Sequence, residues 1–206
     1  MENQKIITAI RHAPSSHNAK KIIAGRKDVP LSDDGRSFAR EFIQERGAMS
    51  ADKIYSSPLQ RSVETASILF DIPIDKLNLE PLCIERSYGE MEGASCIEIE
   101  SMDITYKHVG GIAHSLNPPG GETLEKVKER ANQFLSLLLK DPAKEIAFVS
   151  HQTFLKQFFG LLQGLSVHDS LGIEIYPMSV NCFTFINSKV VEQTKIFEGA
   201  VYIKSW

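Results

Sequence analysis

The chain has few cysteines and no long apolar run, and both absences narrow its class. Its three cysteines are odd in number and widely spaced, with no C-x-x-C pair: Cys83, Cys96 and Cys182. That pattern argues against a zinc site or a disulfide framework and fits a reducing compartment. No stretch approaches ~20 apolar residues, so we expect no membrane span. The first residues lack the apolar segment of a signal peptide, so we predict a cytoplasmic protein.

An excess of one charge sign is also missing. The formal net charge is −3, which gives no general attraction to nucleic acid or an anionic membrane, and we expect neither as a partner. The histidines show no H-x-H or H-E-x-x-H spacing, so no metal site is predicted. A site for an anion must therefore be a local cluster of positive side chains. The 206 residues, without a repeat or linker, predict one domain over residues 1–206.

Apolar runs alternate with helical patterns along most of the chain. Short apolar runs predict strands at 6–10, 53–56, 77–85 (with its exit), 145–150, 180–186 and 190–202, the last two as a hairpin around Asn187-Ser188. Caps and periodicity predict helices that begin near Ser32 and Ser57 and others over 123–139 and 154–162. The alternation predicts an α/β fold, a three-layer α/β/α sandwich with a mostly parallel sheet and a late antiparallel pair. Segment 93–120 is predicted to be irregular and to vary with substrate specificity.

One predicted helix start has an unusually clear pattern. In Ser57-Pro58-Leu59-Gln60, a serine stands at the N-cap, a proline at the first helical position and a glutamine at the third. This pattern is typical of a capping box. It places Arg61 in the first helical turn, directly after the strand at 53–56.

Charged side chains stand where the predicted strands end. Arg11 and His12 end the first strand, Arg61 follows the second, Glu85 follows the third, and His151 ends a later one. Carboxyl ends of parallel strands meet at one edge of a sheet, so these side chains are expected to lie together. Arginines can hold phosphoryl oxygens, a neutral imidazole can attack phosphorus, and a carboxylic acid can protonate the leaving oxygen. The pattern predicts phosphoryl transfer without a metal.

Six segments carry a resemblance to a known family. They are RHAPSSHN at 11–18, LSDDG at 31–35, SSPLQRSVETA at 56–66, ERSYGEMEG at 85–93, PGGET at 119–123 and VSH at 149–151. In this order they resemble R-H-G-E-[ST]-x-x-N, the helix entry L-S-x-x-G, S-S-P-L-x-R-x-x-E-T-A, E-x-x-x-G-x-x-E-G, P-G-G-E-[ST] and V-S-H-G of the histidine phosphatase superfamily. That superfamily includes the cofactor-dependent phosphoglycerate mutases. The ordered set is far more specific than any single match.

The resemblance implies roles for the matched residues. His12 would be the nucleophile that becomes a phosphohistidine, and Glu85 the proton donor. The phosphoryl group would be bound by Arg11, Arg61 and His151, and the substrate contacted near the mouth by Asn18. The other candidate substrate-binding residues are Ser15, His17, Arg86 and Gln152. No cofactor is implied, the expected partner is a small phosphorylated metabolite, and the oligomeric state stays open, a homodimer included.

Three positions depart from the family pattern. Ala13 and Gln152 replace glycines, and Pro14 replaces a glutamate. The methyl group of Ala13 fits if its φ is negative and is strained otherwise. None of the three removes a chemical group that the mechanism needs. Two nearby acids are predicted to be structural, Glu92 as a cap of backbone N–H groups and Glu122 at the start of its helix.

Four functions remain open at this stage. We favour a phosphatase, because no arginine lies between Arg86 and Arg130, where mutases of this superfamily carry a longer insert with added arginines. A mutase is the second candidate, because segment 85–89 looks mutase-like and Arg86 is a candidate for binding a carboxylate. A protein phosphohistidine phosphatase fits less well, since such relatives lack the donor acid. The candidate from another class is a non-catalytic protein that binds a phosphorylated ligand.

Overall fold

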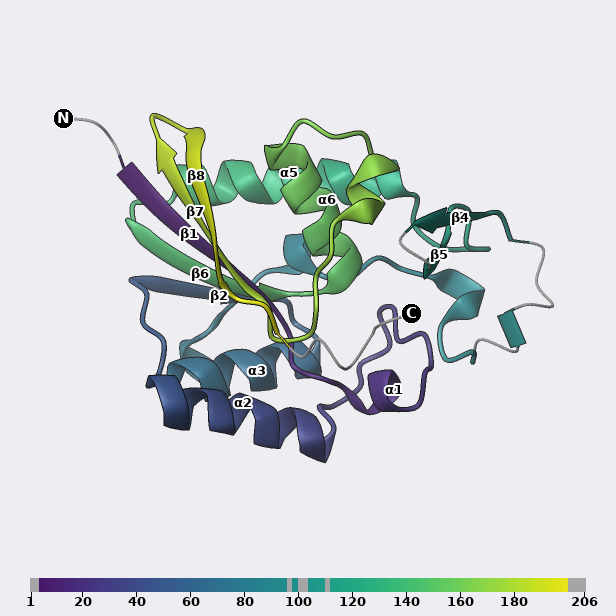
Figure 1. Cartoon of the computed structure of the whole chain (residues 1–206), viewed down its shortest axis with the longest axis horizontal. Coiled ribbons are helices and arrows are strands. Elements are labelled where there is room, and N and C mark those ends of the chain that lie inside the picture. The colour runs from purple at the N-terminus through teal and green to yellow at the C-terminus, as the bar shows by residue number, and fades with distance from the viewer. Residues whose placement is uncertain (1–3, 96–97, 100–103, 110–111, 200–206) are drawn as a thin grey trace.

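A mixed six-stranded sheet forms the centre of the molecule (Figure 1). The fold is a computed structural model, and it describes residues 4–95, 98–99, 104–109 and 112–199. The strand order is β3-β2-β6-β1-β7-β8, in which β3, β2, β6 and β1 run parallel while β7 and β8 are antiparallel. The strands are β1 (Gln4–Arg11), β2 (Lys53–Ser56), β3 (Asn78–Leu79), β6 (Glu145–Ser150), β7 (Val180–Ile186) and β8 (Lys189–Phe197).

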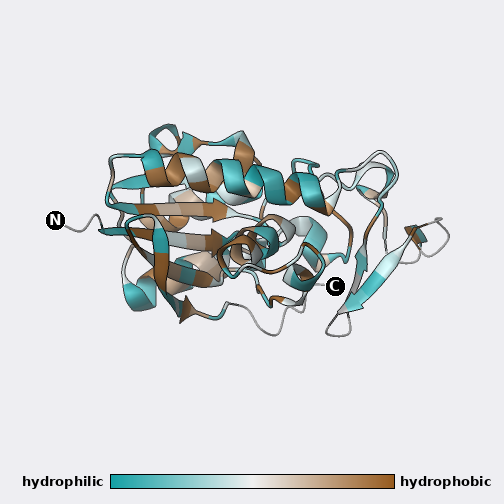
Figure 2. Ribbon diagram, turned by 90° about the horizontal axis from the view of Figure 1, so that it is seen from above, coloured by the Kyte–Doolittle hydropathy of each residue, from teal (hydrophilic) through white to brown (hydrophobic). Residues whose placement is uncertain are grey.

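Helices cover both faces of this sheet, so the three-layer prediction is confirmed. α2 (Asp33–Arg46) and α3 (Gln60–Phe70) lie on one face, and α5 (Leu124–Lys140) and α6 (Gln152–Leu162) on the other. Each pair packs on its own apolar core, and Figure 2 shows many apolar residues along the central strands. Short elements complete the chain: α1 (Ser16–Ala19) and the 3-10 turns η1 (Ile74–Lys76), η2 (Pro81–Cys83), η3 (Gly89–Met91) and η4 (Asp169–Gly172).

Strand predictions agree with the structure where an apolar run is flanked by polar residues. β2, β6 and β7 have the predicted bounds, and the positive φ values of Asn187 and Ser188 confirm the turn between β7 and β8. Only residues 78–79 of the run at 77–85 form a strand. β8 ends at Phe197, and the end of the predicted strand, 200–202, lies outside the described residues.

Two local predictions are wrong. α3 begins at Gln60 with Leu59 as its N-cap, and not at Ser57. The hydroxyl of Ser57 accepts a long bond from the Leu59 N–H at 3.4 Å and lies 2.7 Å from Nε2 of His151. Arg61 is nevertheless in the first turn. Segment 93–120, predicted to be irregular, contains the antiparallel hairpin β4 (Tyr106–Val109) and β5 (Ile112–Ser115). Tyr106 and Ser115 are paired in the register of this hairpin. The glycines and prolines around the two strands favoured a prediction of irregular structure.

The register of the parallel strands brings distant residues to one edge. Arg11 pairs with Ser150, and the His12 N–H donates to the Ser150 carbonyl at 2.9 Å. On the other side of β6, the Ser57 N–H donates to the Val149 carbonyl at 3.0 Å. The segments that follow β1, β2 and β6 therefore leave the sheet side by side, on the side where α1 and the hairpin lie in Figure 1.

At the opposite edge, Asp141 accepts hydrogen bonds from Lys53 Nζ and Tyr55 Oη, both at 2.7 Å. Burial raises the pKa of Asp141, but these bonds and one from the Ala143 N–H outweigh it and lower the pKa to about 2 from 3.8. A carboxyl whose pKa is lower in the folded state than in the unfolded state stabilises the fold at pH values above its unfolded pKa. That stabilisation is lost as the pH falls through the folded pKa. We expect Asp141→Asn to lower the free energy of unfolding by about 1 to 2 kcal/mol at pH 7.

Urea unfolding at several pH values checks this expectation. The difference in the free energy of unfolding between wild type and Asp141→Asn should narrow between pH 4 and pH 2. The control is the Asp75→Asn variant, at an exposed position. A difference of constant size over that pH range would contradict the expectation.

Within the described ranges, none of the helices has the length and apolar character that crossing a bilayer requires.

Candidate active site

His12 stands one residue past β1 and is oriented by its neighbour. Its Nδ1 lies 2.6 Å from the Ala13 carbonyl, which can only accept, so Nδ1 carries the proton. The lone pair is therefore on Nε2, as a nucleophile requires. Ala13 is not among the residues with positive φ, so its methyl group fits without backbone strain. Its N–H donates to Thr65 Oγ1 at 3.0 Å, which fixes the turn.

His151 faces His12 across the end of the sheet. The two ring centroids are 5.1 Å apart, with planes inclined at 57°. The Nε2 of His151 lies 2.7 Å from Ser57 Oγ and 3.2 Å from Ser62 Oγ. Its Nδ1 is buried and finds no hydrogen-bond partner among the described residues. When Ser57 donates to Nε2, the ring proton lies on Nδ1, where it is left for a bound anion.

Two arginines place positive charge beside the two imidazoles. Arg11 ends β1 and donates from Nη1 to the Ile175 carbonyl at 2.7 Å. Arg61 donates to the Gly25 and Lys27 carbonyls at 2.7 and 2.9 Å. Each side chain is only 2% exposed. Burial lowers the pKa of each arginine to about 10, while Glu85 opposes the shift, so both stay protonated near neutral pH.

Both imidazoles are held neutral by this setting. Burial lowers the pKa of His12 well below its usual range, and the charges of Arg61 and Arg11 lower it further. The pKa of His151 is lowered in the same way, by burial first and then by Arg61, His12 and Arg11. A neutral His12 keeps its nucleophilic lone pair even in mildly acidic solution.

Glu85 lies at the N-terminus of α6, which ties it to the segment after His151. Its carboxylate accepts from the N–H groups of Arg86 (2.8 Å), Thr153 (3.2 Å) and Phe154 (3.1 Å). Its charge acts on both Arg11 and Arg61, and the residue is 8% exposed. The structure therefore brings four of the predicted catalytic residues close to His12: Arg11, Arg61, Glu85 and His151.

Arg86 is anchored to backbone carbonyls, and its contact with a substrate stays a prediction. Its Nε, Nη1 and Nη2 donate to the carbonyls of Glu122 (2.7 Å), Ser115 (2.7 Å) and Leu116 (3.1 Å). These bonds hold the end of the hairpin against the segment that carries Glu85. Arg86 is 1% exposed. The three carbonyl bonds satisfy donors of the guanidinium that burial removes from water.

Glu92 and Glu122 form the frame around Glu85, as predicted for structural acids. Glu92 Oε1 accepts from the N–H groups of Arg26 and Tyr88. Glu122 pairs with Arg26 (3.1 Å) and Arg130 (2.8 Å). Arg26 also donates to the Glu85 carbonyl at 3.1 Å. The backbone that carries the Glu85 carboxylate is thus held in place by Arg26 and by the acids that bind Arg26.

The remaining predicted residues lie around α1 and at the start of α6. Ser15 and Asn18 form a reciprocal capping box, in which Asn18 Oδ1 accepts from both the N–H and the hydroxyl of Ser15. His17 is half-buried, and burial, Lys27 and Arg61 lower its pKa, which places it near the cationic site. Gln152 is the first residue of α6, half-buried beside His151. Their contact with a substrate stays a prediction.

The sequence reasoning missed several polar residues that position this site. Ser57 and Ser62 orient His151, and Thr65 joins the Ala13 N–H to the Arg61 carbonyl. Tyr88 Oη lies 2.8 Å from Thr153 Oγ1, beside Glu85. Ser57, Ser62 and Thr65 stand inside the SSPLQRSVETA segment, so their place in the motif was the available signal.

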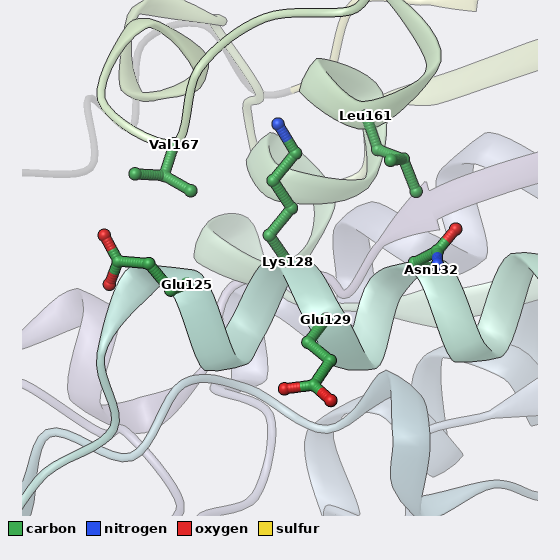
Figure 3. A pocket seen from close by; sticks show the side chains of 6 residues that line it. All are labelled: Glu125, Lys128, Glu129, Asn132, Leu161 and Val167. Carbon is green, nitrogen blue, oxygen red and sulfur yellow. The ribbon is translucent and has the colours of Figure 1, made fainter.

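A pocket of about 370 Å³ lies elsewhere, between α5, the end of α6 and the segment after it (Figure 3). Lys128 extends from α5 toward the segment of Val167 and donates to the Leu165 carbonyl. None of the predicted site residues lines this pocket, whose lining is Glu125, Lys128, Glu129, Asn132, Leu161 and Val167. Among the residues that the structure describes, no group of three or more His, Cys, Asp or Glu side chains is placed to hold a metal ion.

Comparison with known proteins identifies the family. A sequence model of the histidine phosphatase superfamily (branch 1) matches residues 7–195. Fructose-2,6-bisphosphatase TIGAR B of Danio rerio is 27% identical over 189 residues, 89% of this chain and 72% of that protein. The 2,3-bisphosphoglycerate-dependent phosphoglycerate mutase of Rhizobium etli is 26% identical over 206 residues, 95% of this chain and 98% of that protein.

The fold has solved counterparts as well. A mutant phosphoserine phosphatase from Entamoeba histolytica, in complex with phosphoserine, superposes with a TM-score of 0.72 at 21% identity. The match covers 92% of this chain and 96% of that one. At this identity the likeness establishes the fold alone.

Proposed function

The chain belongs to branch 1 of the histidine phosphatase superfamily, and on that premise we propose that it is a metal-independent phosphomonoester hydrolase. Its substrate is a small phosphorylated metabolite, and His12 carries the phosphoryl group as a phosphohistidine. One observation carries the proposal: the His12 and His151 rings are 5.1 Å apart, with the Nδ1 of His12 fixed on a carbonyl and Arg11 and Arg61 acting on both rings.

In the first step His12 Nε2 attacks phosphorus. The N–P bond forms as the ester O–P bond breaks, and Glu85 supplies the proton that the leaving oxygen needs. Negative charge on the equatorial oxygens is held by Arg11, Arg61 and the Nδ1–H of His151. The two guanidiniums, with the neutral N–H donor of His151, do the electrostatic work for which other phosphatases use a metal.

In the second step water attacks the phosphohistidine. Glu85, now ionised, accepts a proton from that water as the new O–P bond forms and the N–P bond breaks. Inorganic phosphate leaves, His12 returns to its neutral form, and Glu85 is protonated again. Atoms and protons therefore balance over one turnover of phosphomonoester and water.

A mutase is the second candidate, because a mutase of Rhizobium etli aligns along nearly the whole chain. Three of the five Arg86 N–H donors are directed to backbone carbonyls, which supports a structural role for this residue over the binding of a substrate carboxylate in that reaction. A non-catalytic binding protein would not need Nε2 of His12 to keep its lone pair. The hydrolase is therefore favoured.

Phosphate release separates these candidates. We expect hydrolysis of p-nitrophenyl phosphate in the presence of EDTA, followed by a panel of phosphorylated metabolites to find the substrate. Incubation with 3-phosphoglycerate and a 2,3-bisphosphoglycerate primer tests the mutase directly. Rapid isomerisation without phosphate release would reject the hydrolase, and no reaction with any substrate would favour the binding protein.

Glu85→Gln tests the proton donor. The amide keeps the size of the side chain but cannot deliver a proton, so hydrolysis of alkyl phosphates should fall by roughly 100-fold. Hydrolysis of p-nitrophenyl phosphate should fall much less, because p-nitrophenolate leaves without protonation. The measurement is kcat/KM for both substrates, with the exposed Glu90→Gln as the matched control. Equal losses on both substrates would argue against the donor role.

A further inference from the structure

Arg26 meets two parts of the active site through different atoms. Its side chain donates from Nε to the Glu85 backbone carbonyl at 3.1 Å. Its backbone lies between two carbonyls, those of Gly25 and Lys27, which accept from the Arg61 guanidinium at 2.7 and 2.9 Å. The same residue therefore connects the backbone of the proposed proton donor with the guanidinium that is proposed to bind the phosphoryl group.

The Arg26 guanidinium is oriented by Glu122. Its Nη2 lies 3.1 Å from Glu122 Oε2, and the same carboxylate accepts from Nε and Nη2 of Arg130 at 2.8 and 2.9 Å. The Glu122 side chain is 12% exposed, so water screens its attraction for the two cations only weakly. Arg130 Nη2 lies 3.5 Å from the Glu85 carbonyl, which is close to the limit of a hydrogen bond. Of these two bonds to the Glu85 carbonyl, the one from Arg26 is therefore the stronger.

The backbone of segment 25–27 is anchored separately from the Arg26 side chain. The Arg26 N–H donates to Glu92 Oε1 at 3.0 Å, and that oxygen also accepts from the Tyr88 N–H at 2.9 Å. Gly25 has a φ of +52°, and a Cβ atom at this position would overlap Glu92 Oε1. Glu92 thus fixes the backbone whose carbonyls hold Arg61, while the Arg26 side chain holds the carbonyl of Glu85. A substitution of that side chain separates the two effects.

We propose that Arg26 is a positioning residue for the proton donor: through the Glu85 carbonyl it fixes where the Glu85 carboxyl stands relative to the phosphoryl group that Arg61 binds. This inference rests on the proposed hydrolase function, and it adds to the leaving-group step a residue that lies outside the six family segments. The Arg26 side chain is 38% exposed, so its truncation opens to solvent and leaves no buried cavity. The substitution therefore changes the placement of Glu85 while the fold is kept.

Arg26→Met tests this role through the dependence of the rate on the leaving group. An alkoxide needs a proton in order to leave and p-nitrophenolate does not, so a displaced Glu85 slows the hydrolysis of an alkyl phosphate selectively. We expect kcat/KM to fall by about tenfold for glycerol 2-phosphate and by less than about twofold for p-nitrophenyl phosphate. The matched control is Arg40→Met, at an exposed position of α2, which should leave both values unchanged. Equal losses on the two substrates, or no loss on either, would overturn the proposal.

A double variant shows whether Arg26 acts through Glu85. In the Glu85→Gln background the proton donor is already absent, so the addition of Arg26→Met should lower hydrolysis of glycerol 2-phosphate by less than about twofold further. The same tenfold loss in both backgrounds would overturn the proposal.

If Arg26→Met does not fold, Glu122→Gln decides. The amide keeps the size of the side chain but removes the charge that orients Arg26, so we expect a loss of about three- to fivefold on glycerol 2-phosphate alone. An equal effect on both substrates, or none, would overturn the proposal. Wild-type hydrolysis of p-nitrophenyl phosphate separates the two hypotheses: its absence would reject the hydrolase, whereas its presence with an unchanged substrate ratio in the variants would reject only the role of Arg26.

Discussion

We expect the His12→Ala variant to lose phosphatase activity by roughly ten-thousandfold or more. The Nε2 lone pair is the only nucleophile in the proposed first step, and His151 cannot replace it, because its own Nε2 is turned to Ser57 and Ser62. Wild-type protein quenched in alkali during turnover of a phosphate-labelled substrate should carry one base-stable, acid-labile label. The variant should carry none.

The control is His168→Ala, an exposed histidine beside η4 that lies outside the site. It should keep both the turnover rate and the label. Label on the His12→Ala protein would assign the nucleophile to another residue. Turnover without any label in the wild type, under conditions where the second step is slow, would instead argue for direct attack by water.

The positions of the main site residues could be predicted because each follows a local pattern. Arg11 and His12 come directly after a continuous apolar run, and His151 follows another. Such runs predict buried parallel strands, and parallel strands place their ends at one edge. The register of β1 on β6 and of β2 on β6 then brings these residues together, as expected.

The error at Ser57 has a physical cause that no local pattern contains. Its sequence context satisfies the rules for a helix N-cap. The hydroxyl accepts only a long bond from the Leu59 N–H, at 3.4 Å, and lies 2.7 Å from Nε2 of His151, which is 94 positions away in the chain. The helix begins two residues later than that cap would place it. A hydrogen bond to a buried imidazole outweighs a cap that solvent can replace.

Arg86 and Lys156 illustrate the same limit for charged residues. An arginine beside Glu85 is a reasonable candidate for binding a substrate, and the sequence does not show that three of its donors meet carbonyls of the hairpin end and Glu122. Lys156 stands in an apolar helix, is 4% exposed, and donates to the Leu171 carbonyl of η4. Which backbone groups a side chain meets depends on tertiary packing, which the sequence alone did not reveal.

We expect Arg61→Lys to lower kcat/KM by about 100- to 1000-fold, although the positive charge is kept. A guanidinium can hold two phosphoryl oxygens while it donates to a third acceptor, whereas an ammonium is a point charge without that planar geometry. The Arg61 side chain also donates to the Gly25 and Lys27 carbonyls. Its backbone carbonyl accepts from Thr65 Oγ1, which in turn accepts from the Ala13 N–H. The substitution therefore weakens both the phosphoryl contact and the placement of the segment at 25–27.

Arg36→Lys is the matched control, because Arg36 pairs with Asp33 and Glu64 on the surface of α2 and α3. It should leave kcat/KM within about twofold, as exposed ion pairs contribute little. The covalent label separates the two effects of Arg61: a lost phosphoryl contact slows label formation at saturating substrate, while a displaced segment alone raises KM. A fall of less than fivefold in Arg61→Lys would mean that this guanidinium does not bind the transferring group, and that Arg11 and His151 hold it without Arg61.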